Sequence, residues 1–274
     1  MRWAGQAAAA LGALLLLGSC KASGPKPLVV CADPNNLPFS NSAGQGFENR
    51  LAEMVAADLH RPLRYVWWAQ RRGYVRQTLN EAKCDLWPGV ASTMDMLATT
   101  RPYYRSTYVF VTRKAAALDH LTLDDPRLRK LRIGVQMVGD DGMNTPPAHA
   151  LARRGIIDNV RGYMLYGDYR EPDPPARIVR DVADGKIDLA LAWGPVGGWF
   201  ARTSAVPLQV QPVTPWLDDA QWPMAYDISM GVQKQDQKLR AQLDAVLQHR
   251  SADIARLLSR YGVPTAQEAD AQDR

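Results

Sequence analysis

Short apolar runs alternate with amphipathic segments along this chain, and this alternation constrains the fold more than any other feature of the sequence. A strand, helix, strand order of this kind predicts a parallel sheet covered by helices. The first set of expected elements comprises strands at 28–30, 63–68 and 84–90 and helices at 47–59 and 73–82. The order then recurs, with strands expected at 132–136, 161–167 and 187–195 and helices at 146–155 and 175–185.

A short internal repeat indicates that the two sets belong to two similar lobes. Lys-x-Asp-Leu occurs at Lys83 and again at Lys186, 103 residues later, each time where a helix hands over to a strand. Val30 and Val135 are offset by 105 residues. Two α/β lobes in tandem explain both offsets, whereas a single doubly wound sheet does not require them. Chance similarity over so short a match is the alternative.

The connections between the expected lobes predict a hinge of two crossing strands. The segments at 106–114 and 227–234 each alternate like an isolated strand. After the second come two amphipathic helices, which we expect to return to the first lobe. The predicted organisation is a signal at 1–22, lobe 1 at 27–107 and 236–264, lobe 2 at 108–235, and a flexible tail at 265–274.

Residues 1–22 predict an export signal. Arg2 precedes an apolar run that ends in small residues, which is typical of a secretory signal rather than a membrane span. The motif that ends at Cys20, Leu-Gly-Ser-Cys, resembles a bacterial lipobox, in which the cysteine is lipidated. Ordinary cleavage near Ala22 is the alternative. Both predict a periplasmic protein. Lipidation at Cys20 would attach it to a membrane through the N-terminal lipid alone, whereas ordinary cleavage would leave it soluble.

The remaining cysteines predict a disulfide. If Cys20 belongs to the export signal, Cys31 and Cys84 form an even pair in an oxidising compartment. Their spacing excludes a CxxC redox or zinc motif. The other interpretation is a pair of buried free thiols.

The charge and the motif content exclude several functions. The net charge of +5 favours acidic partners, but the chain lacks the basic and aromatic pattern of a nucleic-acid-binding module. The basic stretch at 127–132 is more often a solvated face than a docking patch. The sequence contains no HExxH, GxSxG, GxxxxGK[ST] or GxGxxG motif, and its four histidines occur singly. We therefore expect a non-catalytic protein without a metal or cofactor.

Two acidic features of the sequence are candidates for metal binding or catalysis. Asp140 and Asp141 in a Gly-rich turn more often form the turn than coordinate a cation. Glu48 and Asp85 are the only carboxylates that we nominate for an enzyme of this fold. Their places, at a helix start and a strand entry, favour structural roles for both.

Several segments resemble one protein family. CADPNNLPFSN at 31–41, GFENRLAE at 46–53, CDLWPGV at 84–90, TTRPYYRSTYVFV at 99–111 and YGVP at 261–264 are similar to the type II periplasmic solute-binding fold. More narrowly, they resemble its quinoprotein-dehydrogenase-associated branch, the MxaJ/XoxJ-like proteins. The resemblance covers the whole mature chain.

This resemblance implies an α/β protein with two lobes, each built on a mostly parallel sheet flanked by helices and joined by two crossing hinge strands. It also implies a partner. Members of the branch are regarded as accessory proteins that assist the maturation or activation of a PQQ-dependent methanol or alcohol dehydrogenase, in many cases a lanthanide-dependent one. A c-type cytochrome is a further expected partner, and the protein itself is expected to be a monomer. The alternative is the substrate-binding protein of an ABC transporter for a small polar solute.

The sequence departs from the amino-acid-binding members of this fold at two places. These proteins usually carry Ser/Thr-x-x-Arg after the third strand of lobe 1, where the arginine clamps the ligand carboxylate. Here the corresponding region has no arginine before Arg101. In lobe 2, Pro146 and Pro147 remove two amide donors from a helix start that otherwise binds an anion. Both changes weaken the case for a carboxylate ligand.

The resemblance and the expected strand ends together predict the cleft and the hinge. The predicted cleft residues are Asp33, Asn36, Pro38, Phe39, Gln70, Arg71, Ala91, Ser92, Gln136, Trp193, Gly194 and Pro195. The predicted hinge residues are Arg101, Tyr103, Tyr104 and Arg105. We expect the two tyrosines to pack where the lobes meet the hinge and Arg105 to hold a carboxylate or a backbone carbonyl there.

Overall fold

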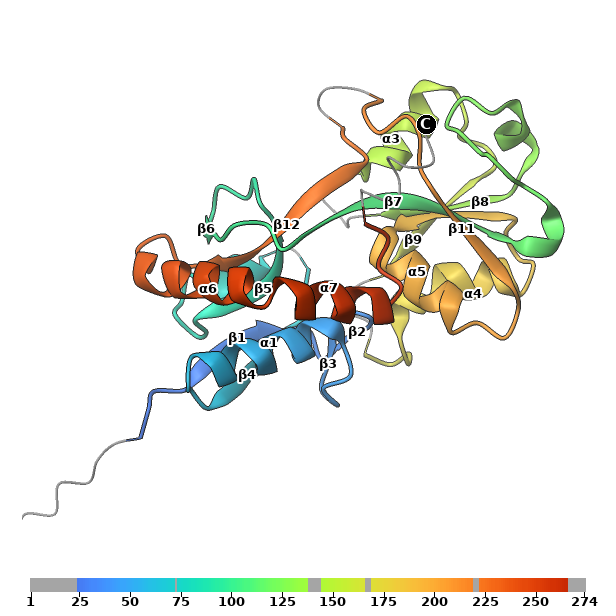
Figure 1. Ribbon diagram of the computed structural model, residues 1–274. Helices are drawn as coiled ribbons and strands as arrows, with labels where there is room; N and C mark the ends of the chain where they lie inside the picture. Colours follow the sequence, from blue (N-terminus) through green and yellow to red (C-terminus); the bar gives the residue numbers. More distant parts are fainter. Residues whose placement is uncertain (1–23, 72, 138–143, 166–168, 219–221, 266–274) are drawn as a thin grey trace, which may run out of the picture.

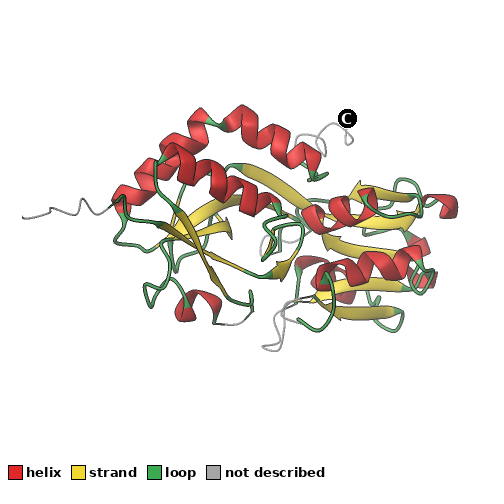
Figure 2. Cartoon of the chain, turned by 90° about the horizontal axis from the view of Figure 1, so that it is seen from below, coloured by secondary structure: helices red, strands yellow, loops and turns green. Residues whose placement is uncertain are grey.

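Two groups of parallel strands, one in each lobe, form the framework of the computed structural model (Figure 1), which describes residues 24–71, 73–137, 144–165, 169–218 and 222–265. The helices lie against the faces of these sheets (Figure 2). The expected export signal with Cys20, the residues Asp140 and Asp141, and the tail from 266 onward fall outside the described residues.

Lobe 1 is built around the buried strand β1 (Leu28–Ala32). It pairs in parallel with β4 (Leu63–Trp67) on one side and with β5 (Leu86–Ala91) on the other. Its main core lies between this sheet and three helices, α1 (Phe47–Asp58), α6 (Gln237–His249) and α7 (Ser251–Arg260). Figure 1 shows α6 and α7, from the end of the chain, beside α1, so the chain does return to the first lobe as expected.

Lobe 2 repeats this plan. Strand β8 (Ile133–Met137) pairs in parallel with β9 (Val160–Met164) and with β10 (Leu189–Trp193). The helices α3 (Pro146–Arg153), α4 (Arg177–Ala183) and α5 (Gly194–Arg202) contact this sheet or the strands joined to it. Strand β11 (Leu208–Pro212) completes the lobe by pairing with the long strand β7 (Tyr104–Arg113).

Two long strands connect the lobes, as the sequence predicts. β7 (Tyr104–Arg113) pairs antiparallel with β10 and β11, and β12 (Ala225–Val232) pairs antiparallel with β5 and with β6 (Ala98–Thr99). The two strands also pair with each other, from Tyr104 to Thr107 on β7. At Tyr108 the partner of β7 changes from β12 to β10, so we infer that the lobes divide within β7.

The internal repeat has a structural counterpart. Asp85 accepts a hydrogen bond from the backbone N–H of Val29, and Asp188 accepts the equivalent bond from Arg132. Each aspartate therefore holds the start of the neighbouring parallel strand. The register pairs Leu86 with Val30 and Leu189 with Ile133, so the residue that corresponds to Val30 is Ile133, not Val135.

The predicted disulfide is confirmed. Cys31 on β1 and Cys84, just before β5, are bonded, with their Cα atoms 5.6 Å apart. Both cysteines are buried in a small cluster under the sheet of lobe 1, with Tyr74, Val75 and Leu79. The bond closes a loop of 53 residues across two neighbouring strands.

Several smaller elements connect these parts. They are β2 (Asn35–Asn36), β3 (Ser40–Asn41), η1 (Lys114–Ala116), η2 (Pro126–Lys130) and η3 (Pro174–Ala176). The prediction of a helix over 73–82 is too long, because α2 spans only Tyr74–Gln77. Thr78 leaves helical backbone geometry and its hydroxyl bonds the carbonyl of Tyr74, which ends the helix.

The strand expected at 187–195 is also too long. It ends at Trp193, and Gly194 and Pro195 instead form the first turn of α5, with the proline at a position where its missing N–H costs nothing. The glycines of α5 allow close packing. A Cβ on Gly197 would lie 2.5 Å from Cγ2 of Val109, and one on Gly198 would lie 1.9 Å from the carbonyl oxygen of Gly262. The sequence did not predict this helix because three glycines lower its apparent helix propensity.

The substitution Gly198→Ala should destabilise the protein, because the added methyl group meets a backbone carbonyl that cannot rotate away. We expect the free energy of unfolding to fall by about 1–3 kcal/mol, as for other overpacked sites. Gly24→Ala is the matched control, since nothing lies within 4 Å of a Cβ there. Urea titration of both variants checks this, and equal midpoints would contradict the packing described.

Candidate functional site

The strand ends of lobe 1 carry polar side chains that bond to one another. The carboxylate of Asp33 accepts the backbone N–H groups of Asn35 at 2.8 Å and Gln70 at 2.7 Å. The side chain of Asn36 donates to Oε1 of Gln70 at 2.7 Å. Burial raises the pKa of Asp33, although these two backbone bonds and Arg71 act in the opposite direction. These three predicted cleft residues are therefore close together and form a braced loop.

The other predicted cleft residues of lobe 1 lie around this loop. The carbonyls of Pro38 and Phe39 accept the first backbone N–H groups of α1, and the ring of Phe39 packs on Phe47 at 5.4 Å between centroids. Ala91 ends β5, and the hydroxyl of Ser92 contacts β12 through the carbonyl of Asp227 at 3.0 Å and through Oγ of Ser229 at 2.6 Å. Arg71 is exposed beside Asp33.

In lobe 2 the predicted residues are buried or half-buried. Oε1 of Gln136 accepts a hydrogen bond from the backbone N–H of Trp193 at 3.3 Å. The backbone carbonyl of Gln136 accepts a hydrogen bond from the hydroxyl of Thr145 at 2.7 Å. The indole of Trp193 packs on Tyr108 and Tyr226, at 5.2 and 6.0 Å between ring centroids. Gly194 and Pro195 are buried in the first turn of α5.

The predicted hinge residues lie at the junction of β7 and β12. Tyr103 and Tyr104 contact each other, at 4.9 Å between ring centroids, and both belong to or border the core of lobe 1. Arg105 forms an ion pair with Asp227 of β12 at 3.1 Å, on the exposed side of the strand pair. The backbone N–H of Arg101 binds the carboxylate of Asp244 on α6 at 2.7 Å.

A direct contact between the lobes was not predicted. The side-chain amide of Asn35 in lobe 1 donates to the backbone carbonyl of Glu171 in lobe 2 at 2.9 Å. Tyr169 lies in the same loop of lobe 2, near enough to Asp33 and Arg71 for their charges to affect its pKa, which burial raises to about 12. The contact joins loops that are far apart in the sequence, and no local pattern marks it.

Glu48 is the most unusual polar group of this region. It is the second residue of α1, only 3% exposed, and its Oε2 has no hydrogen-bond partner among the described residues. The hydroxyls of Tyr74 and Tyr103 and the indole nitrogen of Trp87 are also buried without a partner in this part of the structure. Burial alone raises the pKa of Glu48 to about 8, so the carboxyl is protonated at neutral pH.

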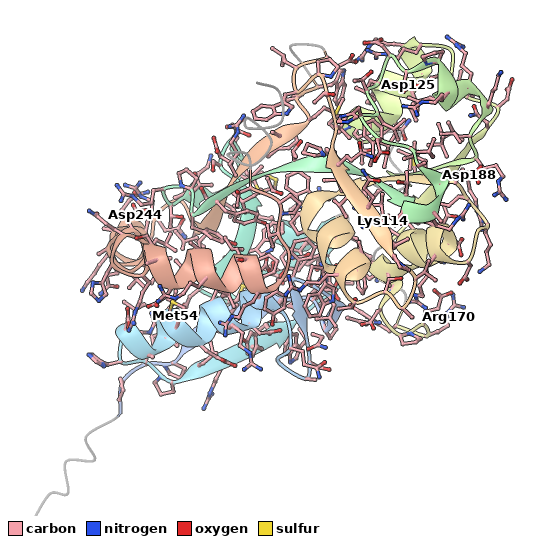
Figure 3. All side chains as sticks on the ribbon, turned by 45° about the vertical axis from the view of Figure 1, so that its right-hand side comes forward. Met54, Lys114, Asp125, Arg170, Asp188 and Asp244 are labelled. Atoms are coloured by element: carbon pink, nitrogen blue, oxygen red, sulfur yellow. A yellow bond between two sulfur atoms is a disulfide. The ribbon has the colours of Figure 1, made fainter. Side chains whose placement is uncertain are left out.

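Other features of the described chain do not form sites. The described residues contain no group of His, Cys, Asp or Glu side chains suited to a metal, and none of their helices is long and apolar enough to cross a membrane. The basic stretch at 127–132 is largely engaged. Arg127 pairs with Asp125 and Arg132 with Asp188, and Figure 3 shows both aspartates on the outer end of lobe 2, away from Met54 and Asp244 of lobe 1.

Glu48 and Asp85, the two carboxyl groups that the sequence suggests for an enzyme, do not have the surroundings of a reactive pair. Asp85 binds the guanidinium of Arg61 at 2.8 Å and the backbone of Val29, so its role is structural. Glu48 is buried in lobe 1, and burial is the only cause of its raised pKa, with no contribution from a second carboxylate of the described chain. The geometry therefore favours binding through shape and packing over acid–base chemistry.

Comparison with known proteins identifies relatives over nearly the whole described chain. Residues 28–264 match the model of the bacterial extracellular solute-binding proteins, family 3. The protein MoxJ of Methylorubrum extorquens is 35% identical over 249 residues, which are 86% of this chain and 81% of that protein. The protein MoxJ of Paracoccus denitrificans is 30% identical, over 94% of this chain and 96% of its own length.

A solved structure supports the same relationship. The crystal structure of the periplasmic binding protein XoxJ from Methylobacterium extorquens AM1 superposes with a TM-score of 0.71 at 39% sequence identity. The match covers 87% of this chain and 98% of that one. The expected periplasmic binding protein fold is thus confirmed, and the similarity supports a periplasmic location.

The substitution Glu48→Gln should remove a pH dependence of stability. Folding raises the pKa of Glu48 from 4.5 to about 8, so this residue stabilises the protein fully at low pH, and that contribution is lost as the pH rises through this window. The loss by pH 9 is of order 5 kcal/mol at most. The glutamine variant should show a flatter profile between pH 5 and 9 and a higher stability than the parent at pH 9.

Urea titrations at five pH values measure this difference. Asp58 and Asp188 have lowered pKa values through their arginine partners, so their contributions fade only as the pH falls below about 4 and do not overlap the window of Glu48. Parallel pH profiles for the parent and the variant above pH 5 would show that the carboxyl of Glu48 is not held neutral.

Proposed function

Because this chain belongs to the bacterial extracellular solute-binding proteins, family 3, and within them to the branch that contains MoxJ and XoxJ, we propose that it is an accessory protein of a periplasmic dehydrogenase. In this proposal it is non-catalytic. It binds a PQQ-dependent methanol or alcohol dehydrogenase, or a segment of it, and assists the maturation or activation of that enzyme. The cleft between the lobes is the proposed docking site.

One observation carries this proposal beyond the family relationship. The polar side chains at the strand ends are occupied within the protein, as the bonds of Asp33, Gln136 and Ser92 show. A receptor for a small polar solute instead presents a few convergent polar groups to its ligand. A cleft whose polar groups are already satisfied is better suited to a partner that it recognises by shape and apolar contact.

The exposed apolar residues near the strand ends support the same proposal. Trp68 follows β4, Met96 lies between β5 and β6, Met164 ends β9, and Tyr169 lies in the loop beyond it. Parallel strands in each lobe place their carboxyl ends at one edge, which is where ligands of such folds bind. Methionine and aromatic side chains are adaptable contact residues for protein partners. We call these four residues the cleft rim.

The alternative function is that of a solute receptor for an ABC transporter, which the family description favours. A ligand that binds the folded state must raise the melting temperature. A thermal-shift screen of amino acids, polyols and small organic acids distinguishes the two functions. A saturable shift with one solute, together with no binding to any dehydrogenase, would favour the receptor.

The location of the protein and its further partner complete the proposed function. We propose a monomer held near its partner in the periplasm, with Cys20 lipidated and a c-type cytochrome of the same electron-transfer system close by. These features are consistent with the lipobox-like motif at 17–20 and with the basic net charge of +5, which favours acidic partners.

Substitutions at the cleft rim test the docking site. Replacing Trp68 and Met164 by alanine should weaken binding of a co-expressed dehydrogenase at least tenfold, since well-packed contact residues are worth about 1–2 kcal/mol each. The matched control is Ile157→Ala. Ile157 is 61% exposed but precedes β9, at the end of the strand opposite to Met164.

Surface plasmon resonance with the immobilised dehydrogenase gives the affinities. If the Ile157→Ala control loses binding and the double variant keeps it, the dehydrogenase binds at a surface other than the cleft. Equal affinity of all three proteins would exclude the rim.

The mass of the mature protein tests the lipid anchor. If Cys20 is lipidated, the protein isolated from membranes should begin at Cys20 and carry the mass of a diacylglyceryl group with or without a further acyl chain. Cys20→Ser should release it into the soluble periplasmic fraction. A mature protein that begins after Ala22 without added mass would show ordinary cleavage.

A further inference from the structure

The carboxyl of Glu48 occupies a fixed place between helix α1 and strand β5. A Cβ built on Gly89 would lie 2.0 Å from its Oε1, so the carboxyl fills the space that a side chain at position 89 would take. Gly89 lies in the middle of β5, whose partners are β1 and β12. Glu48 therefore connects the first turn of α1 with the strand that leads to the hinge.

The charge of Glu48 acts on four tyrosine hydroxyls. Tyr65 comes from β4, Tyr74 from α2, Tyr103 from the residue before β7 and Tyr104 from its first position, while Asp33 acts on Tyr74 from the loop after β1. Burial raises the pKa of all four tyrosines, and the charge of an ionised Glu48 would raise it further. Lysine, arginine and histidine are not among the causes of the raised pKa of Glu48 within the described chain.

A short chain of contacts runs from this carboxyl to lobe 2. Phe47, the residue before Glu48, packs edge-on against Tyr104 at 6.1 Å between centroids. The side chain of Trp193 makes a hydrogen bond with Tyr104, and its ring packs on Tyr226 of β12. Tyr104 thus touches α1 of lobe 1 on one side and the strand end of β10 in lobe 2 on the other.

We propose that Glu48 is a proton-dependent lock on the hinge. With its proton bound, the carboxyl is neutral, and the first turn of α1 packs closely against Tyr103 and Tyr104. When the proton leaves, a buried charge without a counter-ion remains, and such a charge is relieved by movement toward water. The hinge residue that contacts the first turn of α1 is Tyr104, through Phe47, so loss of the proton loosens the contact of Tyr104 with Trp193 between the lobes.

The lock would make the arrangement of the lobes respond to the pH of the compartment. Below neutral pH the lobes are held as in the present structure, and in alkaline surroundings the hinge is released. The inference does not depend on which partner occupies the cleft, because every group in it belongs to this chain.

Fluorine NMR of the mature, disulfide-bonded protein labelled with 5-fluorotryptophan tests this inference. The resonance of Trp193 is assigned with Trp193→Phe and followed from pH 6 to pH 9.5. We expect it to shift with a midpoint near pH 8 in the parent protein and to stay constant in Glu48→Gln. A constant Trp193 resonance in the parent, or an unchanged titration in Glu48→Gln, would overturn the proposal.

A second variant separates the lock from a general loss of structure. Tyr104→Phe keeps the ring contact with Phe47 but removes the hydroxyl that bonds Trp193. The stability of this variant should still depend on pH through Glu48. Its Trp193 resonance, however, should no longer shift as the pH rises. If Trp193 still titrates with the same midpoint in Tyr104→Phe, the coupling does not pass through Tyr104 and the proposed route is wrong. Near-ultraviolet circular dichroism at pH 6 confirms that each variant is folded.

Discussion

The antiparallel pairing of β7 with β12 is the interaction on which the rest of the structure depends. Four residue pairs, from Thr107 with Ala225 to Tyr104 with Ile228, join strands that each continue into a different lobe. The sheet of one lobe is therefore continuous with that of the other through these two strands. The neighbouring pairing of β12 with β5 brings Asp227 and Ser229 beside Ser92. Tyr104, at the end of the β7–β12 pairing, lies between α1 and Trp193.

The two buried carboxyl groups Asp33 and Glu48 of lobe 1 differ in how their oxygens are satisfied. Asp33 is buried, yet both of its oxygens accept backbone N–H groups, which is the usual state of a buried carboxylate. Glu48 lies in the same lobe without such partners, and the structure accommodates it only by keeping it neutral. Natural sequences break the rule of satisfied polar groups mainly at functional or strained places. The contrast is why we assign a role to Glu48 and a bracing role to Asp33.

Much of the architecture could be predicted from the sequence because it depends on local periodicity. The alternation of strands and helices predicts both sheets, and the segments at 106–114 and 227–234 predict the crossing strands. The paired Lys-x-Asp motifs have a physical meaning, since Asp85 and Asp188 each accept a backbone N–H at the start of a neighbouring strand, from Val29 and Arg132. The local pattern does not predict α5. Its glycines lower the helix propensity of the segment, but they allow close tertiary contacts with Val109 and Gly262. The contact between Asn35 and Glu171 was out of reach for the same reason, because it exists only once both lobes are folded.

The end of the chain adds a third contact between the lobes and so restricts how the hinge moves. The carbonyl of Pro264 accepts the hydroxyl of Ser106 on β7, and Tyr261 stacks on Trp199 of α5 at 4.8 Å between ring centroids. Tyr261 also packs on Phe47 of α1, so one residue touches both lobes. A rigid opening about β7 and β12 would have to break these contacts or turn about them. Gly198 of α5 and Gly262 also approach each other closely here, since a Cβ on Gly198 would lie 1.9 Å from the carbonyl oxygen of Gly262. An opening of the lobes would also break the bond between the side-chain amide of Asn35 and the backbone carbonyl of Glu171.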